Sequence, residues 1–214
     1  IPGEEIKLNA DFSVHTAKED GAFNVVSKCA YGNTVDLKKG TKMWEEKEKV
    51  LKSEEVDEKN IQFQKKNFYL LDINKYFVEN SFDFVLQSIG IYNNVELVKK
   101  ACEILVLRTT ELVKDINSNV VPIIPSQTTM DYCFDVKIRQ NDYTLGQILV
   151  YFMYNQLFDK TISFIGFKKM HPHDEECVLR IAYKKVADKD LVKTHLGQGC
   201  AEIVMIIKKI NGLF

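Results

Sequence analysis

The sequence predicts an α+β fold built from short strands and two long helices. Apolar residues alternate or cluster over strand-length spans at 4–14, 23–31 and 81–92, which is typical of strands. Two longer spans, beginning near Asn93 and near Asp188, instead repeat their apolar residues at alternating spacings of three and four. That repeat is typical of a helix with an apolar seam, so we expect small sheets combined with two seamed helices.

The composition is that of an ordinary globular protein. With 214 residues, 45% of them hydrophobic and 28% charged, the chain can form one sizeable core or two modest ones. A formal net charge of -1 argues against nonspecific binding to a nucleic-acid backbone. The five cysteines include no Cys-x-x-Cys pair, and their odd number argues against a complete set of disulfides, so we expect reduced thiols in an intracellular protein. No run approaches the roughly 20 apolar residues that cross a bilayer.

The N-terminal third is predicted to contain a hairpin or meander followed by a charged segment. The strands at 4–14 and 23–31 are separated by a polar loop that contains Gly21. Residues 36–67 are rich in Lys and Glu and have few apolar anchors, so we expect a solvated helix or a mobile excursion there. A strand pattern begins almost at once after Ile1, which leads us to expect a fragment of a longer protein.

A strand and the first seamed helix are predicted next. The strand at 81–92 alternates so that one face, which carries Phe82 and Phe84, is expected to be dry. Asn93 stands three residues before Glu96, a spacing typical of a helix start. The helix that follows is about 24 residues long. Its seam consists of Val95, Val98, Cys102, Leu105, Thr109, Leu112 and Ile116.

The second half is predicted to form a separate module after a connector. Two prolines and a polar cluster at 120–130 cannot continue the helix, and we place the main internal boundary there. The module then contains a strand at 131–139, a helix from about Thr144 to Leu157, strands at 162–170 and 177–184, and the second seamed helix. The seam of that helix consists of Val192, Leu196, Gly199, Ile203, Ile206, Ile210 and Leu213.

Both seams must be buried, because an isolated helix has only marginal stability in water. We expect that the two helices can pack on each other. Gly197, Gly199 and Ala201 lie near the centre of the second helix, where small residues would admit another backbone closely.

Residues 142–149, Asp-Tyr-Thr-Leu-Gly-Gln-Ile-Leu, begin a stretch that resembles a known family. Together with the strands at 162–172 and 177–183, they resemble the small dimerising subunit of multisubunit RNA polymerases. This is the eleventh subunit of RNA polymerase II and the archaeal L subunit, where an acidic-x-Thr-Leu-Gly-Asn motif opens the first helix. Residues 171–175 stand where that family has its His-Pro turn, and the likeness covers residues 131–214.

The N-terminal half resembles another component of the same enzymes. Residues 3–8, 17–23 and 29–31 resemble the insertion domain of the third subunit of RNA polymerase II and of its archaeal counterpart, where a Gly-x-Glu strand precedes a Gly-Lys-Glu-His-Ala-Lys-Trp loop. Residues 81–116 resemble the end of the dimerisation domain in that same protein, and residues 34–76 match nothing in it. The departures from the loop are Ala17, Asp20, Gly21 and Phe23.

Third-subunit and eleventh-subunit modules joined in one polypeptide resemble the fused subunit of large DNA viruses that encode their own polymerase. The resemblance implies two modules with the fold of the bacterial α N-terminal domain, made of strands and long helices, with a β-rich insertion domain. The implied boundaries are 1–76 for the insertion-domain-like region, including a charged excursion at 36–67, 77–119 for the C-terminal part of the third-subunit-like dimerisation domain, 120–130 for a linker and 131–214 for the eleventh-subunit-like dimerisation domain.

The resemblance implies a non-catalytic assembly scaffold of a DNA-directed RNA polymerase, which pairs two α-like modules in one chain and docks the two large catalytic subunits. The implied partners are those subunits and the small assembly subunits, with DNA contacted only through the complex and with no membrane and no cofactor. The implied locations are the viral factory and the virion. The residues expected at interfaces are Val98, Cys102, Leu105, Leu112, Asp142, Thr144, Leu145, Gly146, Ile148, Leu149, Phe152, His171, Pro172, Leu196, Ile203, Ile206 and Ile210.

Two other classes of function stay open from the residues alone. The run His171-Pro-His-Asp-Glu-Glu-Cys177 contains ligand types that zinc uses, so a small metal-binding enzyme is one alternative, although no distant ligand pair accompanies the run. A self-associating interaction protein, whose helices pair between chains, is the other. No Ser or Cys nucleophile has an evident His and carboxylate constellation, which argues against catalysis.

Four lysines form one further candidate feature. Lys168, Lys169, Lys184 and Lys185 are predicted to flank a turn between two successive strands and to form a small basic patch. A solvated sheet end is the expected role, with contact to a large subunit or nucleic acid as the less favoured alternative.

Overall fold

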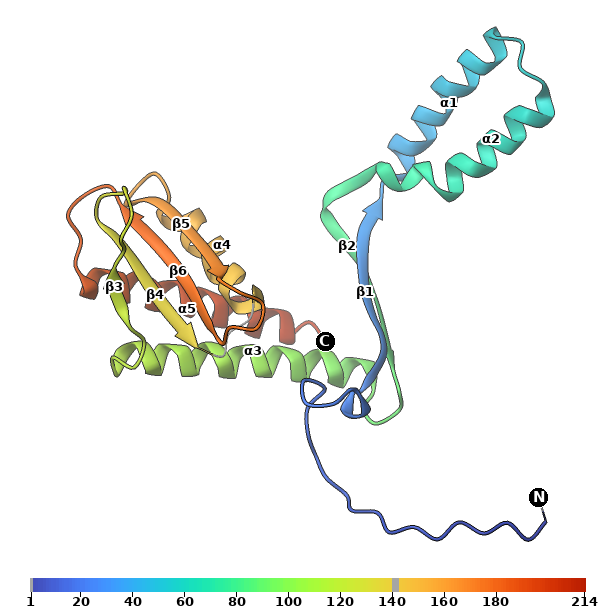
Figure 1. Ribbon diagram of the computed structural model, residues 1–214. Helices are drawn as coiled ribbons and strands as arrows, with labels where there is room; N and C mark the ends of the chain where they lie inside the picture. The colour runs from blue at the N-terminus through green and yellow to red at the C-terminus, as the bar shows by residue number, and fades with distance from the viewer. Residues whose placement is uncertain (1, 140–142) are drawn as a thin grey trace. The chain divides into compact units, whose positions relative to one another are not determined.

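The computed structural model describes residues 2–139 and 143–214, and these residues form a mixed α+β protein with two small sheets (Figure 1). The chain divides into two compact units, Ile1–Asn94 (unit 1) and Val95–Phe214 (unit 2), each with its own sheet. None of the helices in the described part of the chain is long and apolar enough to cross a membrane. At the level of α+β, the predicted fold class is confirmed.

Unit 1 is built on a two-stranded antiparallel ribbon. β1 (Val26–Val35) pairs with β2 (Phe77–Ser88), and Tyr31 stands opposite Phe84. A short 3-10 turn, η1 (Gly21–Phe23), precedes β1. Both strands coincide with strands predicted from the sequence, with their ends shifted by a few residues.

Two sequence predictions for unit 1 are wrong. Residues 4–14 form no strand in the described structure, since their backbone is bonded to no neighbouring strand and an apolar alternation alone does not make one. The face of β2 that carries Phe82 and Phe84 is not dry, since these side chains are 49% and 73% exposed. A two-stranded ribbon has no second layer of its own to cover such a face.

Between β1 and β2 the chain forms a helical hairpin with a small core. α1 (Leu37–Ser53) and α2 (Glu58–Leu70) are followed by the 3-10 turn η2 (Asp72–Lys75). The charged segment, predicted to be a solvated helix or a mobile excursion, is helical and forms an ordered pair of helices. A few apolar side chains suffice for a core when two helices face each other. The buried residues of this core are Trp44, Leu51, Ile61, Phe68 and Ile73.

The two ends of the α1–α2 segment, at Asp36 and Tyr76, lie next to each other where the segment joins the ribbon. The backbone N–H of Asp36 donates to the carbonyl of Tyr76 at 2.9 Å, so the ends of the hairpin are neighbours. The Asp36 side chain accepts from the N–H of Lys39 at 3.0 Å and caps α1. The indole N–H of buried Trp44 donates to Glu48 at 2.8 Å, which satisfies the donor that burial removes from water.

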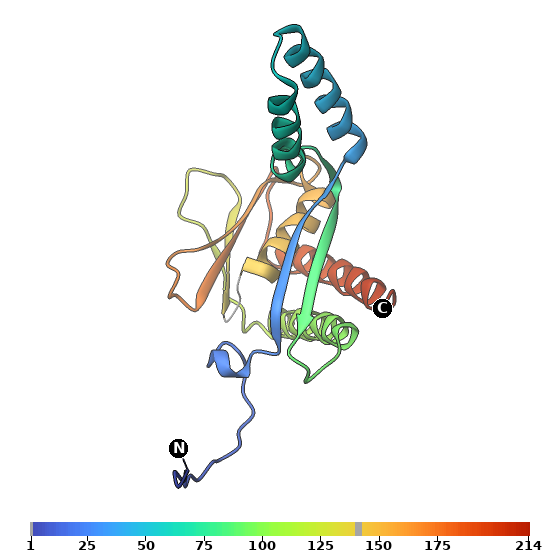
Figure 2. The same cartoon turned by 90° about the vertical axis from the view of Figure 1, so that its right-hand side faces the viewer.

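Unit 2 is a four-stranded antiparallel sheet with helices packed on one face. Its elements in chain order are α3 (Asn94–Asn117), β3 (Ile123–Pro125), β4 (Cys133–Arg139), α4 (Tyr143–Leu157), β5 (Ile162–Lys169), β6 (Glu176–Tyr183) and α5 (Lys189–Asn211). The strands lie in the order β3-β4-β6-β5. α4 packs against β5 and α5, and Figures 1 and 2 show both helices on the same side of the sheet.

Successive side chains along each strand of the sheet point to opposite faces, one buried and one open. In β4, Phe134, Val136 and Ile138 are buried under the helices, whereas Asp135 and Lys137 lie on the open face. The strands and helices predicted for residues 131–214 are all present in the described residues. Helices α4 and α5 add Leu145, Leu149, Met153, Val192, Leu196, Cys200 and Ile203 to the core.

The connector predicted at 120–130 contains a strand of the sheet. β3 pairs with β4, and Ile123 is buried. The two compact units divide between Asn94 and Val95. Proline ends a helix but is also tolerated on an edge strand, where a missing N–H costs no ladder bond. Pro122 and Pro125 therefore fit an edge strand as well as they fit a linker.

Candidate assembly interface

Helix α3 enters the core of unit 2 with its C-terminal half. Along its seam Val95 is 46% exposed, Val98 and Leu105 are half-buried, and Cys102 is buried. Leu112, predicted as an interface residue, packs with Ile116 in the same core as the sheet. Thr109 is fully buried, and its hydroxyl donates to the carbonyl of Leu105 at 2.7 Å. The seam is thus closed at one end and partly open at the other.

Helix α5 shows a similar gradient. It begins at Asp188, whose side chain accepts from the N–H of Leu191 at 2.8 Å. Leu196 and Ile203 are buried, Ile206 is half-buried and Ile210 is 39% exposed. Its seam therefore opens toward the C-terminal end, where Leu213 and Phe214 are exposed. α3 and α5 contribute to one core, but α4 is the helix that packs most closely on α5.

The small residues of α5 admit side chains rather than another backbone. A Cβ atom at Gly199 would lie 2.9 Å from Leu149 and 3.0 Å from Met153, both on α4. A Cβ atom at Gly197 would meet nothing within 4 Å. The expectation of a close backbone approach is therefore wrong at Gly199, which instead lets α4 side chains fill the space.

Helix α4 carries most of the polymerase-like motif. Leu145, Gly146 and Leu149 are buried. Ile148 and Phe152 are half-buried and packed against the core, while Thr144 is exposed. A Cβ atom at Gly146 would overlap the ring of Phe167 on β5, so only glycine fits there. The remaining motif residue, Asp142, lies outside the described residues.

The outer side of α4 was missed by sequence reasoning. Tyr143, Gln147, Tyr151 and Tyr154 lie three or four residues apart and are exposed, so they form one stripe, the tyrosine face. Residues 143–157 include no Asp, Glu, Lys or Arg, and this absence is the signal that could have found the face. Charge depletion combined with aromatic enrichment is typical of the core of a protein–protein interface.

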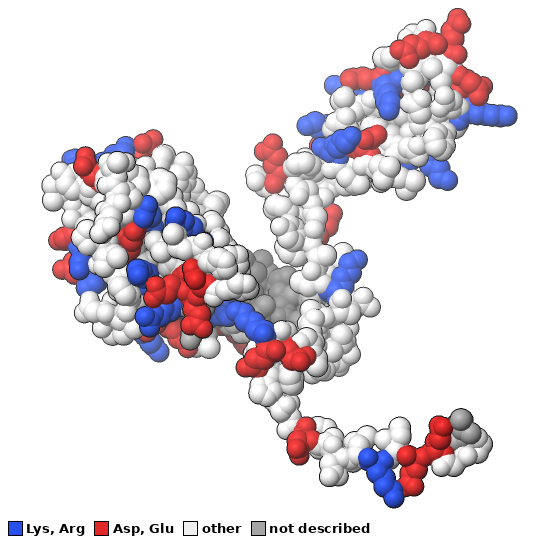
Figure 3. All heavy atoms as spheres, viewed as in Figure 1, with Lys and Arg blue, Asp and Glu red and all other residues white. Residues whose placement is uncertain are grey.

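Several charged side chains on the open face of the sheet are paired with one another. Asp135 accepts two hydrogen bonds from Arg180, at 2.7 and 2.8 Å, and one from the hydroxyl of Ser126 at 3.0 Å. The bonds from Arg180 do most to hold the pKa of Asp135 below its ordinary value. Glu176 pairs with Lys137 and Arg139 at 3.4 and 3.3 Å. Figure 3 shows basic and acidic side chains interspersed on the face of unit 2 that it displays, so no single-sign field is present there.

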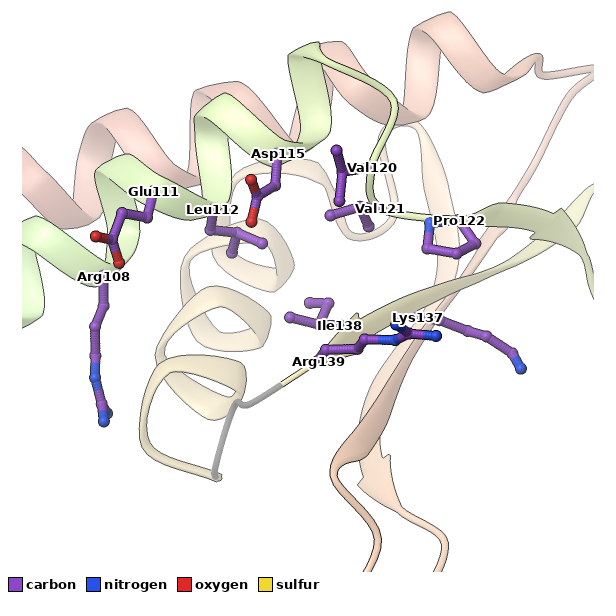
Figure 4. A pocket seen from close by; sticks show the side chains of 10 residues that line it. All are labelled: Arg108, Glu111, Leu112, Asp115, Val120, Val121, Pro122, Lys137, Ile138 and Arg139. Atoms are coloured by element: carbon purple, nitrogen blue, oxygen red, sulfur yellow. The ribbon is translucent and has the colours of Figure 1, made fainter.

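A cleft of about 330 Å³ lies between the end of α3 and β4 (Figure 4). Helix α3 contributes Arg108, Glu111 and Asp115 to its lining, and β4 contributes Lys137 and Arg139. Among the described residues the lining contains no His, Cys, Ser or Thr, and its charged side chains are of both signs. Charges of both signs can pair with polar groups of a bound segment.

A buried polar pair lies inside the core of unit 2. The hydroxyl of Tyr183 and Nδ1 of His195 share a hydrogen bond at 3.1 Å, and their rings are stacked. Burial lowers the pKa of His195 and raises the pKa of Tyr183. Both side chains are therefore held neutral, and their role is to satisfy each other in an apolar core.

The His171 run is split between surface and core. His171 and His173 are exposed, and the backbone N–H of His173 donates to Nδ1 of His171 at 3.2 Å. Pro172 is also exposed, whereas Cys177 is fully buried in the core. Within the described residues, no group of three or more His, Cys, Asp or Glu side chains is arranged to hold a metal. The metal alternative therefore gains no support from this arrangement.

The four lysines do not form one patch. In the antiparallel pairing of β5 and β6, Lys169 stands opposite Cys177 beside the turn, whereas Tyr183 stands opposite Ile162 at the far end. Lys184 follows Tyr183 and binds Asp159 at 2.9 Å. At about 3.3 Å per residue, the two lysine pairs lie on the order of 20 Å apart. The predicted basic patch is wrong because Lys168 and Lys169 lie at the end of the hairpin next to the turn, whereas Lys184 and Lys185 lie at its opposite end.

No protein-family model matches the sequence, and the comparison with curated proteins finds no match. The fold and the surfaces described above therefore carry the functional argument.

Proposed function

We propose that this chain is a non-catalytic assembly subunit of a multisubunit DNA-directed RNA polymerase, in which third-subunit-like and eleventh-subunit-like modules are fused. One observation carries the proposal. Residues 133–211 form the order strand–helix–strand–strand–helix, with Thr144-Leu145-Gly146 at the start of the first helix. Helix α3, which the proposal assigns to the third-subunit-like module, buries Leu112 and Ile116 in the same core.

Pairing two α-like modules in one chain is the first half of the proposed role. The C-terminal half of α3 and the buried part of α5 belong to one core, which is what an intramolecular pair requires. A tether supports this arrangement, because it makes pairing intramolecular at a high effective concentration. The half-buried positions Val98, Leu105 and Ile206 are then available at the open ends of the seams.

Docking of the two large catalytic subunits is the second half. The tyrosine face offers an uncharged surface that can be desolvated at little cost, and tyrosine tips still find hydrogen-bond partners there. Small assembly subunits are the other proposed partners, and DNA is contacted only through the complex. In a virus that encodes its own polymerase, such a complex would work in the viral factory or be packaged in the virion.

The test is co-purification from the native host system. The full-length protein, carrying an affinity tag, should recover both of the largest RNA polymerase subunits in stoichiometric amounts. Tyr151→Asp should reduce their recovery at least about tenfold, because it places a charge at the centre of a desolvated interface. Val186→Asp is the matched control, since Val186 is 78% exposed on the loop between β6 and α5.

A monomer or homodimer recovered without the large subunits would contradict the proposal. A homodimer would favour the self-associating alternative, for which the open ends of the α3 and α5 seams are the supporting observation. Equilibrium sedimentation of the purified chain distinguishes that pairing between chains from the intramolecular pair proposed above.

A further inference from the structure

Unit 1 contains a strand pattern that has no sheet. In residues 4–14, which we call the arm, Ile6, Leu8, Ala10, Phe12 and Val14 alternate strictly with polar residues. The arm has no strand pairing in the described structure, and Figure 1 draws it as an extended trace. Its apolar side chains are exposed, Phe12 fully so. Strict alternation over the nine residues 6–14 is the pattern of a half-buried strand, so the arm is a strand that lacks an acceptor.

Unit 1 also contains a two-stranded ribbon with an exposed aromatic face and an unpaired strand edge among the described residues. One face of the β1–β2 ribbon gathers its aromatic side chains, and the Tyr31 ring contacts the rings of Phe82 and Phe84 at 6.1 and 5.7 Å. The members of this aromatic face are Cys29, Tyr31, Asn33, Phe82, Phe84 and Leu86. The outer edge of β1 pairs with no strand among the described residues. A two-stranded ribbon is only marginally stable, and a third strand would stabilise it.

The connector between the arm and β1 is already closed. The rings of His15 and Phe23 lie 5.0 Å apart, and His15 also contacts the Glu19 carboxylate at 2.7 Å. The N–H groups of Glu19 and Asp20 both donate to the carbonyl of Thr16. Because residues 15 and 23 are in contact, the chain enters and leaves the connector at neighbouring points. This geometry is that of a hairpin connection between sequential strands.

We propose that the arm adds to the outer edge of β1 of its own chain as an antiparallel third strand, with Leu8 opposite Tyr31 and Ala10 opposite Cys29. Directly opposed residues of neighbouring strands point to the same face. The apolar residues of the arm are all even-numbered, whereas the aromatic face uses the odd-numbered residues of β1. The apolar side chains of the arm therefore lie on the aromatic face only in registers that pair an even-numbered arm residue with an odd-numbered residue of β1.

Charges select one register among those that satisfy this condition. With Leu8 opposite Tyr31, Asp11 stands opposite Lys28 on the other face of the sheet. Lys7 then stands opposite Gly32, whose partner on β2 is Asp83. Gly32 has no side chain, so the long Lys7 side chain can reach across it toward Asp83. A slip of one residue would instead place Lys7 and Asp11 over the aromatic rings.

Docking of the arm has a consequence for binding. An open, apolar strand edge is a template for pairing with other chains, and the arm would occupy that edge and extend the aromatic face with its own apolar side chains. The tether keeps the effective concentration of the arm high, so a competing strand must displace it. The inference concerns unit 1 alone and does not depend on the polymerase proposal.

Cysteine trapping tests the pairing in the full chain. Cys29 is exposed, and the other four cysteines are buried, so it is the thiol available to an oxidant. Directly opposed residues in an antiparallel pair have Cα atoms about 4.5–5.5 Å apart, which suits a disulfide. Ala10→Cys should therefore form an intramolecular disulfide with Cys29 under mild oxidation. Peptide mapping and mobility on a non-reducing gel would report it.

Asn9→Cys is the matched control, because it has nearly the same tether to Cys29 but points to the opposite face in the docked arm. We expect Ala10→Cys to cross-link about tenfold faster than Asn9→Cys. Adding Leu8→Asp to Ala10→Cys should remove most of that difference. Leu8 is 73% exposed, so this change cannot act by unfolding a core.

Equal cross-linking rates for the two cysteine variants would overturn the proposal, because an undocked arm presents both thiols alike. A disulfide between two chains would also overturn it, since the acceptor would then be a second copy. A fast cross-link at position 10 that Leu8→Asp leaves unchanged would show that the apolar stripe does not hold the arm, and would equally reject the pairing described here.

Discussion

The phenyl ring of Phe167 lies directly against the backbone of α4 at Gly146, where a side chain would overlap it. The ring of Tyr143 contacts the same phenyl group edge-on at 5.8 Å. The glycine of the Thr-Leu-Gly motif is therefore required by packing of the helix on the sheet. Helix propensity alone would favour another residue at this position.

Gly146→Ala should destabilise unit 2 by about 1–3 kcal/mol, because overpacking against Phe167 outweighs the gain in helix propensity of up to about 1 kcal/mol. Urea unfolding followed by circular dichroism would measure the loss. Gly197→Ala is the control, since a Cβ atom there meets nothing within 4 Å. It should stabilise α5 by about 0.5–1 kcal/mol, and equal effects of the two substitutions would contradict the packing argument.

The Asp135–Arg180 pair should make stability depend on acid. The folded state lowers the pKa of Asp135 from 3.8, chiefly through the hydrogen bonds from Arg180. The stabilisation is therefore present above about pH 4 and is lost as the pH falls through the lower folded pKa. Asp135→Asn should remove this part of the acid dependence.

At pH 7 the same variant should lose about 1–3 kcal/mol, because Arg180 is left with a neutral partner at a site where its side chain is 28% exposed. Glu176→Gln should cost much less, since that carboxylate is more exposed. Unfolding free energies of the three proteins between pH 2.5 and pH 7 provide the measurement; parallel curves for wild type and Asp135→Asn would reject the assignment.

The buried His195 should make the chain less stable in mild acid. Burial lowers the pKa of His195 below 6.5 in the folded state, so the unfolded chain binds the proton more readily. Stability contributed by neutral His195 is thus complete above about pH 6.5 and is lost as the pH falls toward the folded pKa. His195→Gln should flatten this part of the profile in equilibrium unfolding, whereas Gln198→Ala, at an exposed position of the same helix with no titratable side chain, should leave its slope unchanged.

A charge on the α5 seam should unfold unit 2. Ile203 is 1% exposed, so Ile203→Asp should cost about 3 kcal/mol or more and shift thermal unfolding strongly downward. Met205→Asp, two residues further on and 57% exposed, should change the midpoint little. Leu105→Asp on α3 should have an intermediate effect, because Leu105 is half-buried. Normal thermal stability of Ile203→Asp would contradict the burial of the α5 seam in the core of unit 2.

The second half of the chain is readable from sequence because each element has a local signal. The alternation of residues 133–139, the capping position of Asp188 and the seam of α5 all depend on residues close in the chain. Burial of Leu149 and Leu196 follows from that periodicity alone. The overlap at Gly146 does not, because Phe167 is distant in sequence and only the folded sheet brings it under α4.

The first half is harder to predict because its partners are far apart. Tyr31 pairs with Phe84 across an inserted helical hairpin, and no local pattern specifies that pairing. Trp44 is buried in the small core of the α1–α2 hairpin, and the few apolar residues of residues 36–67 did not predict that such a core would form. The tyrosine face is not predicted for a different reason. Tyr151 and Tyr154 fit both a buried and an exposed helix face, and the only signal for the surface is the absence of charged residues from α4.

The hydrogen bond between Asp36 and Tyr76 gives residues 37–75 the properties of an exchangeable cassette. Because the two ends meet, a tight two-residue turn can replace the helices and leave a simple hairpin. We expect the same junction to accept a fluorescent domain whose termini lie close together. A reporter installed there would track the protein in living cells while leaving the sheet and helices of unit 2 unaltered.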